Sequence, residues 1–352
     1  MPTRATTVSA NYSMKMLITG GCGFIGCNAA RYFLTRGYEV TLYDNLSRPL
    51  TGLNLEWLRA IGGVELIQGD VQDSPLVEAT LRAGRFDVVL HLAGQVAVTT
   101  SVADPRLDFE SNALGTFVVL EAVRKHSPGS AFLYASTNKV YGTLKGVHHG
   151  EEPTRYGFVG HPDGISEAQP LDFHSPYGCS KGCADQYVID YARIYGLRTV
   201  SLRQSCIYGT RQFGVEDQGW LAWFIIAHLL GKEVTIYGTG KQVRDVLYVD
   251  DLLRCYEAVI QNIDQVKGQA LNIGGGLANS ISLVEFLGML DQITGRPVRR
   301  VHADWRPGDQ PVYISDIRKA RELIGWEPAT GVAQGVSQLH AWVGANLSCF
   351  EH

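Results

Sequence analysis

Residues 15–36 constrain the fold of this chain more than any other stretch. Lys15–Thr19 (KMLIT) is a short apolar run that predicts a buried strand, and a helix is expected after the letters GGCGFIG. Within those letters Gly20, Gly23 and Gly26 have GxxGxxG spacing. Glycines at this spacing allow a tight turn, a close approach of the backbone to a pyrophosphate, and close packing of the helix. Because the motif stands between a strand and a helix, it predicts a dinucleotide site with the phosphates at the helix N-terminus.

Acidic residues end the next two expected strands. EVTLYD ends at Asp44, where a carboxylate can accept hydrogen bonds from the adenosine ribose and repel a 2′-phosphate. Asp44 therefore favours NAD over NADP, although Arg48 nearby could hold that phosphate. VELIQGD ends at Asp70, which could face the adenine or, as a turn residue, bond its own backbone.

The alternation of strands and helices continues to residue 204. Helices are expected around 53–61 and 74–83, and strands at DVVLHLAG, AFLYAS and RTVSLRQ (198–204). Such repeated βα units predict an α/β protein of Rossmann type, with a doubly wound parallel sheet and helices on both faces. Ligands bind at the carboxyl ends of the strands of such sheets.

The pattern changes after residue 204. We expect a helix over 220–230, short strands near 234–238 and 242–251, a buried segment at 271–276, and helices over 282–294 and 316–324. Segment 142–174 is polar and rich in Gly and Pro, and it is expected to form a loop near the active site. We therefore predict a flexible tail (1–13), a dinucleotide-binding domain (14–204, with some return from 240–273) and a smaller α/β domain (205–352).

Composition excludes several other classes of protein. The chain has 352 residues and a formal charge of −4, without a basic run that would indicate nucleic-acid binding. No apolar run is long enough to predict a membrane span. The seven cysteines lack the spacing of a disulfide framework, which favours a reducing cytoplasm. Cys179 and Cys183 lie on the expected Tyr177 helix and are interpreted as packing residues, so no metal site is expected.

Tyr177 and Lys181 form the strongest catalytic candidate. Their i, i+4 spacing places the phenol and the ammonium on one face of a helix. A tyrosine has an ordinary pKa of about 10, and a nearby positive charge lowers it. Lys181 can supply that charge, and so can an oxidised nicotinamide. We therefore expect Tyr177 to act as a base toward a sugar hydroxyl.

These motifs together resemble the extended short-chain dehydrogenase/reductase superfamily. GxxGxxG, Asp44, HLAG, STNKVYG and YxxxK occur in the order and spacing of that superfamily across nearly all of residues 14–345. The resemblance implies a catalytic triad of Thr137, Tyr177 and Lys181, with NAD as the cofactor. It also implies a set of cofactor-binding residues: Gly20, Gly23, Phe24, Ile25, Gly26, Asp44, Asn45, Ser47, Arg48, Asp70, Val71, Leu92, Ala93, Gly94 and Ser136, together with Tyr177 and Lys181.

Longer strings resemble one family within it, the 2-epimerases of CDP-deoxyhexoses. These strings are GQVAVTTS (94–101), STNKVYG (136–142), LDFHSPYGCSKG (171–182), RQF with EDQGW (211–220) and GKQVRDVL (240–247). The resemblance implies that residues 205–352 bind a nucleotide-diphosphate sugar. The implied substrate-binding residues are Gln95, Thr137, Asn138, Ser205, Gln218, Arg244 and Arg306. Gln204, Cys206 and the pair Val215–Glu216 depart from the family pattern near the expected sugar pocket.

The residues after Thr137 limit which reactions the site could catalyse. A tyrosine base and a nicotinamide oxidise an alcohol to a ketone, after which a 4,6-dehydratase must eliminate water. The resembling dehydratases carry an Asp–Glu pair for this purpose, where this chain has Asn138 and Lys139. The reaction that remains is oxidation followed by re-reduction, which inverts a carbinol centre. The choice of C2 over C4 rests on the resemblance, and a non-catalytic dinucleotide sensor stays a third hypothesis, although such proteins typically lack YxxxK.

Two helices predict an oligomer. A helix over 108–125 carries the apolar stripe Phe109, Ala113, Phe117, Leu120 and Val123, and the Tyr177 helix carries Tyr187, Val188, Tyr191 and Ile194. Part of this surface must cover the sheet, and the remainder could pair with a second subunit. We therefore expect a homodimer or a homotetramer.

Overall fold

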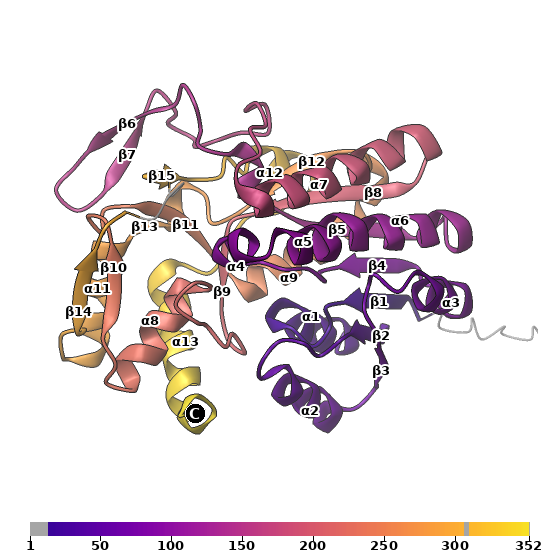
Figure 1. Ribbon diagram of the computed structural model, residues 1–352, viewed down its shortest axis with the longest axis horizontal. Helices are drawn as coiled ribbons and strands as arrows, with labels where there is room; N and C mark the ends of the chain where they lie inside the picture. The colour runs from indigo at the N-terminus through magenta and orange to yellow at the C-terminus, as the bar shows by residue number, and fades with distance from the viewer. Residues whose placement is uncertain (1–12, 306–309, 352) are drawn as a thin grey trace, which may run out of the picture.

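The computed structural model describes residues 13–305 and 310–351 (Figure 1). The expected tail at 1–13 lies outside the described residues apart from Ser13, whose hydroxyl donates a hydrogen bond to the Gly37 carbonyl oxygen. In the described part of the chain, none of the helices has the length and apolar character of a membrane span.

A seven-stranded parallel sheet forms the larger part of the molecule, which confirms the predicted fold class. Its strands lie in the order β12 (Ala270–Ile273), β8 (Arg198–Gln204), β5 (Ala131–Thr137), β4 (Val88–His91), β1 (Lys15–Thr19), β2 (Glu39–Asp44) and β3 (Val64–Gln68). The strand order reverses direction between β1 and β4, and such a switch point is where parallel sheets bind their ligands. The edge strand β12 comes from late in the sequence, so the second half of the chain completes this sheet.

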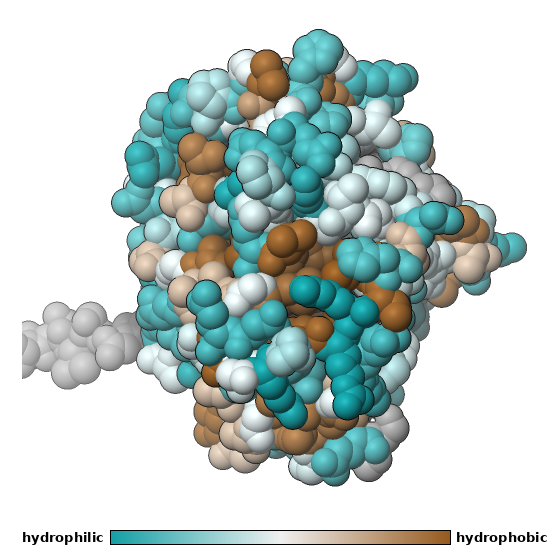
Figure 2. Space-filling model, turned by 90° about the vertical axis from the view of Figure 1, so that its left-hand side faces the viewer, coloured by the Kyte–Doolittle hydropathy of each residue, from teal (hydrophilic) through white to brown (hydrophobic). Residues whose placement is uncertain are grey.

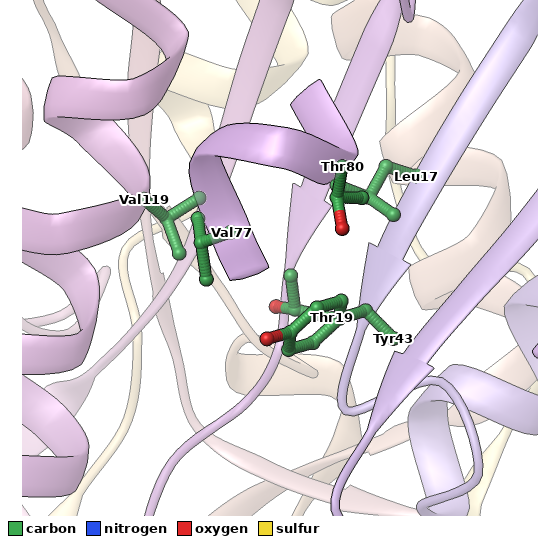
Figure 3. A pocket seen from close by; sticks show the side chains of 6 residues that line it. All are labelled: Leu17, Thr19, Tyr43, Val77, Thr80 and Val119. Carbon is green, nitrogen blue, oxygen red and sulfur yellow. The ribbon is translucent and has the colours of Figure 1, made fainter. Parts of the chain in front are cut away.

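Helices cover both faces of the sheet (Figure 1). One face packs against α1 (Phe24–Leu34), α2 (Thr51–Ile61), α9 (Val249–Gln261), α10 (Ile263–Val266) and α12 (Arg318–Ile324). The other face packs against α3 (Ser74–Gly84), α6 (Gly115–His126) and α7 (Ser175–Tyr195). The strands are apolar on both sides because each face is covered. Leu17, Thr19, Tyr43, Val77, Thr80 and Val119 surround a void on the second face that leaves no room for a water molecule (Figure 3), so it is a packing gap rather than a ligand site.

The expected helix over 108–125 is wrong as a single α-helix. The structure has α4 (Val98–Ala103) and α5 (Pro105–Phe109), then a π-helical turn (Glu110–Leu114), and only then α6. A π turn changes the register of a helix, so residues spaced for one α-helical face do not stay on one face. Leu120 and Val123 are buried, whereas Phe109 and Phe117 are exposed.

The second half of the chain forms a smaller unit with its own core (Figure 1). Its elements are β9 (Cys206–Tyr208), α8 (Trp220–Leu229), β10 (Val234–Tyr237), β11 (Val243–Tyr248), η3 (Leu277–Asn279), β13 (Ser280–Ser282), α11 (Leu283–Thr294), β14 (Arg300–Ala303), β15 (Val312–Tyr313), α13 (Val332–Ala345) and η4 (Leu347–Phe350). β11 pairs with β9, β13 and β15, and β10 pairs with β14. The outer face seen in Figure 2 mixes hydrophilic and hydrophobic residues, with a hydrophobic group near its middle.

Hydrogen bonds between two residues explain where α11 begins in the second half of the chain. Ser282 and Glu285 form a capping box, in which Ser282 Oγ accepts from the Glu285 amide and Glu285 Oε2 accepts from the Ser282 amide. This pair satisfies two amides that would otherwise lack a partner, and so begins α11 at Leu283. The expected strand over 242–251 is shorter, because α9 begins at Val249.

Segment 142–174 is not all loop. It contains an antiparallel hairpin of β6 (His148–Glu151) and β7 (Tyr156–Val159), and the 3₁₀ turn η2 (Asn138–Tyr141) comes just before it. The hairpin contacts the second half, since Lys241 Nζ lies 2.7 Å from Glu151 Oε1 and the Tyr156 amide donates to the Lys241 carbonyl oxygen. These strands were not predicted from the sequence, because both are partly exposed and therefore polar in composition.

Candidate active site

The glycine loop joins β1 to α1 and lies against the end of β4. Gly20 has φ +67°, and a Cβ there would stand 2.8 Å from the Ala93 amide nitrogen. A Cβ on Gly26 would stand 2.2 Å from the Gly20 carbonyl oxygen. Gly23 is the N-cap of α1 and offers no side chain to its first amides. The amides of Phe24, Ile25 and Gly26 therefore begin a helix without a side-chain cap, an arrangement that fits the pyrophosphate of a dinucleotide.

Asp44 lies at the end of β2 and is tied to the glycine loop. Its Oδ2 accepts from the Cys22 amide at 2.9 Å, and its Oδ1 accepts from the Leu46 amide at 2.8 Å. Each carboxylate oxygen retains a second lone pair for a ribose hydroxyl. The carboxylate is thus fixed in place before any ligand arrives.

The other side chains predicted for the adenosine end bond mostly to one another. Asn45 Nδ2 donates to Asp70 Oδ2 at 2.8 Å, and the Ser47 amide donates to Asn45 Oδ1. Asp70 Oδ1 also accepts from the Gln72 amide, so both roles considered for this acid, facing the site and bonding its own turn, fit its position. Arg48 donates to Gln218 Oε1, which directs its guanidinium toward the loop before α8.

Several predicted positions follow β4, among them Leu92, Ala93 and Gln95. The backbone of Leu92 and Ala93 faces Gly20, and Val71 packs its side chain into the core. Gln95 was expected to contact the substrate, but both ends of its amide bond the Ala97 backbone. In this conformation Gln95 holds its own loop.

Thr137, Tyr177 and Lys181 come together at the carboxyl end of β5. Thr137 is the last residue of β5, and Tyr177 and Lys181 lie on the first two turns of α7. The Thr137 hydroxyl lies near enough to the Tyr177 phenol to affect its pKa, and Lys181 Nζ donates to the Ala135 carbonyl oxygen at 2.6 Å. All three side chains are buried. Asn138 is also buried, and its Oδ1 accepts from Thr137.

The pKa of Tyr177 differs from the prediction. Burial raises the pKa of Tyr177 to about 12, the nearby Thr137 hydroxyl opposes this, and Asp108 adds to it. Burial lowers the pKa of Lys181 to about 7, opposed by Asp108 and Asp185. The chain's own residues therefore do not favour the phenolate, and the positive charge of an oxidised nicotinamide would be the group that does.

Three other predicted side chains are used inside the protein. Ser136 Oγ donates to Asp185 Oδ1 at 2.8 Å rather than facing the cofactor site. Ser205 Oγ donates to Asp245, and Arg244 Nη1 donates to the carbonyl oxygen of its neighbour Val243. Arg306 lies outside the described residues.

The positions that depart from the family pattern also have internal partners. Gln204 Nε2 donates to the Tyr256 hydroxyl at 2.8 Å inside the core. Val215 pairs with Gln218 through two backbone hydrogen bonds, which closes a turn. Burial raises the pKa of the Cys206 thiol, which keeps it neutral.

Sequence reasoning missed a layer of charged residues beneath the triad. Asp108, Asp185 and Arg203 are all buried around the start of α7, and Arg203 Nη2 lies 2.8 Å from Asp185 Oδ2. Charged residues inside a strand and inside apolar helices are the signal that could have revealed them, since they are rarely buried without a partner.

Comparison with known proteins identifies the class. The model of the family described as GDP-mannose 4,6 dehydratase matches residues 17–339, and the chain belongs to this family. Its members and structural relatives are NAD-dependent epimerases and dehydratases, which confirms the resemblance to the extended short-chain dehydrogenase/reductases.

Individual relatives narrow the class further. The chain is 45% identical over 334 residues to CDP-paratose 2-epimerase of Salmonella typhi, covering 94% of this chain and 99% of that protein. UDP-glucose 4-epimerase of Thermotoga maritima, solved with UDP-glucose, is 30% identical with a TM-score of 0.81, covering 95% of this chain and all of that one. The enzyme of the same name from Thermus thermophilus, solved with NAD, is 31% identical with a TM-score of 0.78, covering 94% and 98%.

Proposed function

We propose that this protein is an NAD-dependent epimerase that inverts C2 of a CDP-deoxyhexose, in the manner of CDP-paratose 2-epimerase. The observation that carries the proposal is the identity of 45% over nearly the whole of both chains. The arrangement of Thr137, Tyr177 and Lys181 at the carboxyl end of β5 supports it. NAD suits the site because the glycine loop and the uncapped start of α1 fit a pyrophosphate.

The chain's own residues have separate roles in this reaction. Bound NAD supplies a hydride acceptor and donor for the carbinol carbon. Tyr177 takes the proton of the C2 hydroxyl as the ketone forms and returns a proton when the carbonyl is reduced on its other face. Thr137, whose hydroxyl lies beside Tyr177, orients the phenol and the substrate oxygen. Lys181 binds the nicotinamide ribose, and the positive charge of the oxidised nicotinamide would favour the phenolate.

The residues after the triad threonine argue against dehydration. Elimination of water needs a further acid and base, and neither Asn138 nor Lys139 is a carboxylic acid. Asn138 is buried with its Oδ1 bonded to Thr137, which suits the positioning of a hydroxyl rather than the transfer of a proton. Oxidation followed by re-reduction therefore accounts for the residues present.

The two parts of the chain would hold the two ends of the reacting complex. In this proposal residues 14–204, completed by the return from 240–273, bind NAD, and residues 205–352 bind the nucleotide diphosphate. Arginines suit the diphosphate because their planar fork bonds phosphate oxygens bidentately, and Arg244 and Arg306 are the candidates. A firm hold on the nucleotide would let the sugar turn and present its other face.

Inversion of C4 is the second candidate, because two solved relatives are UDP-glucose 4-epimerases. The deciding experiment offers CDP-, UDP-, GDP- and dTDP-hexoses to the NAD-loaded protein and follows each by NMR. We expect inversion at C2 of a CDP-deoxyhexose and no loss of water. Inversion at C4 of a UDP-hexose, without reaction of CDP-sugars, would replace the proposal with the second candidate.

We propose further that the protein is at least a dimer. Phe109, Phe117, Tyr187, Ile194 and Tyr195 are exposed on α5, α6 and α7, and Phe117 meets Tyr187 edge-on at 5.7 Å. A hollow of about 390 Å³ beside them is lined by Pro105, Phe109, Pro176, Cys179, Ser180 and Cys183 and could receive side chains of a second copy. Exposed apolar surface of this kind is typical of an interface. Light scattering at micromolar concentration tests this, and a monomer would contradict it.

The proposed setting is the cytoplasm. All seven cysteines are free, including the pair Cys179 and Cys183 one helical turn apart. Free thiols are typical of proteins in a reducing compartment.

A further inference from the structure

Asp108 is a fully buried carboxylate that contacts the catalytic helix. It lies on α5 just before the π turn, and none of its surface is exposed. Its Oδ2 accepts from Ser180 Oγ at 2.5 Å, and its Oδ1 accepts from Asn112 Nδ2 at 3.1 Å. Within the described residues, no lysine, arginine or histidine makes an ion pair with it. Burying a carboxylate is costly unless it is paired and hydrogen-bonded, so an acid at this position calls for a functional explanation.

Asp185, on the same side of the sheet, is a buried carboxylate whose negative charge is balanced by an ion pair. It is equally buried, but it has the Arg203 guanidinium at 2.8 Å and accepts from Ser136 and Ser201. Its negative charge is therefore matched locally. Among the described residues, Asp108 accepts hydrogen bonds from two neutral side chains. Its negative charge is therefore less neutralised than that of Asp185 and has a stronger effect on nearby ionisable groups.

Ser180 connects Asp108 to the catalytic turn of α7. Its hydroxyl contacts the Tyr177 carbonyl oxygen at 3.2 Å as well as Asp108 Oδ2, and the next residue along the chain is Lys181. A hydrogen bond at Ser180 therefore fixes the stretch of helix that carries both catalytic side chains. Asn112 Nδ2 also lies 3.2 Å from Ser180 Oγ, which ties the π turn to the same point.

We propose that Asp108 is a positioning residue for the epimerase reaction: it anchors the catalytic turn of α7 through Ser180 and provides the counter-charge for Lys181. This inference rests on the proposed function for its consequence in catalysis. The π turn has a role in it, because it brings Asp108 and Asn112 inward together at the start of α7. Turns of this kind are frequent at functional sites.

The proposal predicts how the pKa values of Lys181 and Tyr177 depend on the charge of Asp108. Burial lowers the pKa of Lys181 to about 7, and Asp108 is the first of the two charges that oppose this, ahead of Asp185. Asp108 also raises the pKa of Tyr177. The other groups that face this pair are the Tyr134 ring, whose centroid lies 4.4 Å from Lys181 Nζ, and neutral His91 on β4. Removal of the Asp108 charge should therefore lower the pKa of both catalytic groups.

The first test is Asp108→Asn, which keeps the shape and removes the charge. In NMR of the cofactor-free protein labelled at lysine Cε, and assigned with Lys181→Arg, we expect the Lys181 titration to move about one pH unit lower. In the epimerase assay the acid and alkaline limbs of the kcat–pH profile should both move to lower pH. A purely structural role would lower kcat at every pH and leave both limbs in place.

Three further variants complete the design. Asp108→Thr removes the charge while keeping a hydrogen-bond acceptor, and it replaces Asp108→Asn if that variant does not fold. Ser180→Ala keeps the charge and cuts the link to α7, so we expect kcat to fall roughly tenfold with the Lys181 titration nearly unchanged. Asp190→Asn removes an exposed acid from the same helix and should change neither readout.

The outcomes separate this inference from the proposed function. An unchanged Lys181 titration in the charge-removing variants overturns the counter-charge, and parent kcat in Ser180→Ala overturns the anchor. If no sugar is epimerised by the parent, the proposed function fails, yet the NMR titration still decides the relation between Asp108 and Lys181.

Discussion

Arg203 and Asp185 form a buried ion pair between the last strand before the second half and the catalytic helix. Arg203 Nη2 lies 2.8 Å from Asp185 Oδ2, Arg203 Nε lies 3.2 Å from Oδ1, and both side chains are almost fully enclosed. Asp185 stands four residues after Lys181 on α7, and Arg203 lies on β8. The pair therefore fixes α7 against the sheet below the site.

Loss of the cation alone should be costly. Arg203→Met leaves the Asp185 carboxylate buried without a cationic partner, and we expect a loss of about 3–5 kcal/mol in the free energy of unfolding. The double variant with Asp185→Asn should recover part of that loss, because the uncompensated charge is gone. Urea unfolding of the three proteins measures both effects. Equal stability of the parent and Arg203→Met would contradict the assignment.

Gly26 should be intolerant of any side chain. Its Cβ would stand 2.2 Å from the Gly20 carbonyl oxygen, so Gly26→Ala must displace the glycine loop. We expect NAD binding to weaken at least about tenfold, measured by calorimetry. Gly52→Ala is the matched control, since a Cβ there meets nothing within 4 Å on α2, and it should bind NAD like the parent. Equal affinity in Gly26→Ala would remove the loop from the NAD site.

Tyr177→Phe should preserve the fold and abolish most turnover. The phenol is the proposed base, and such a group contributes roughly 10²–10⁴-fold to the rate. Tyr187→Phe serves as the control, because its ring is half-exposed on the same helix away from Thr137. If Tyr177→Phe keeps near-parent kcat with intact NAD binding, another residue is the base.

His91 predicts a pH dependence of stability. Burial lowers the pKa of His91 to about 3, and its ring bonds Thr19 and Thr116 as a neutral group. In the unfolded chain the ring takes up a proton below about pH 6.5, whereas the folded protein does not until about pH 3. Its contribution is therefore fully present above pH 6.5 and is lost as the pH falls toward 3, by roughly 3–5 kcal/mol over the whole window.

The measurement compares urea unfolding of the parent and His91→Gln between pH 7 and pH 4.5, both at saturating NAD. We expect the variant to be less stable at pH 7 but to lose less stability on acidification. Parallel pH dependences in the two proteins would show that the ring is not held neutral.

Local sequence signals predicted most of the fold, because strands and capped helices depend on residues close together. The glycine loop, the parallel strands and the start of α11 follow from such signals. The π turn did not, since it changes the register of a helix without a breaking residue in Glu110–Leu114. The β6–β7 hairpin was hidden by its polar composition, and α9 and α13 were not predicted.

The candidate site was predicted at the level of backbone positions more than of side-chain roles. The triad meets because β5 ends and α7 begins at the same edge of the sheet. Gln95, Ser136 and Ser205 turn instead to partners inside the protein, and sequence spacing contains no information about which hydrogen bond a side chain selects. The raised pKa of Tyr177 has the same origin, because burial depends on the whole fold.

The central claim is that the protein inverts C2 of its sugar by removing a hydride and returning it to the same carbon. A CDP-deoxyhexose deuterated at C2, incubated with the NAD-loaded protein in ordinary water, tests it most directly by NMR and mass spectrometry. The account predicts an inverted product that keeps deuterium at C2, with no solvent hydrogen at that carbon. Loss of the label to solvent, or a label retained at C2 while C4 inverts, would contradict it.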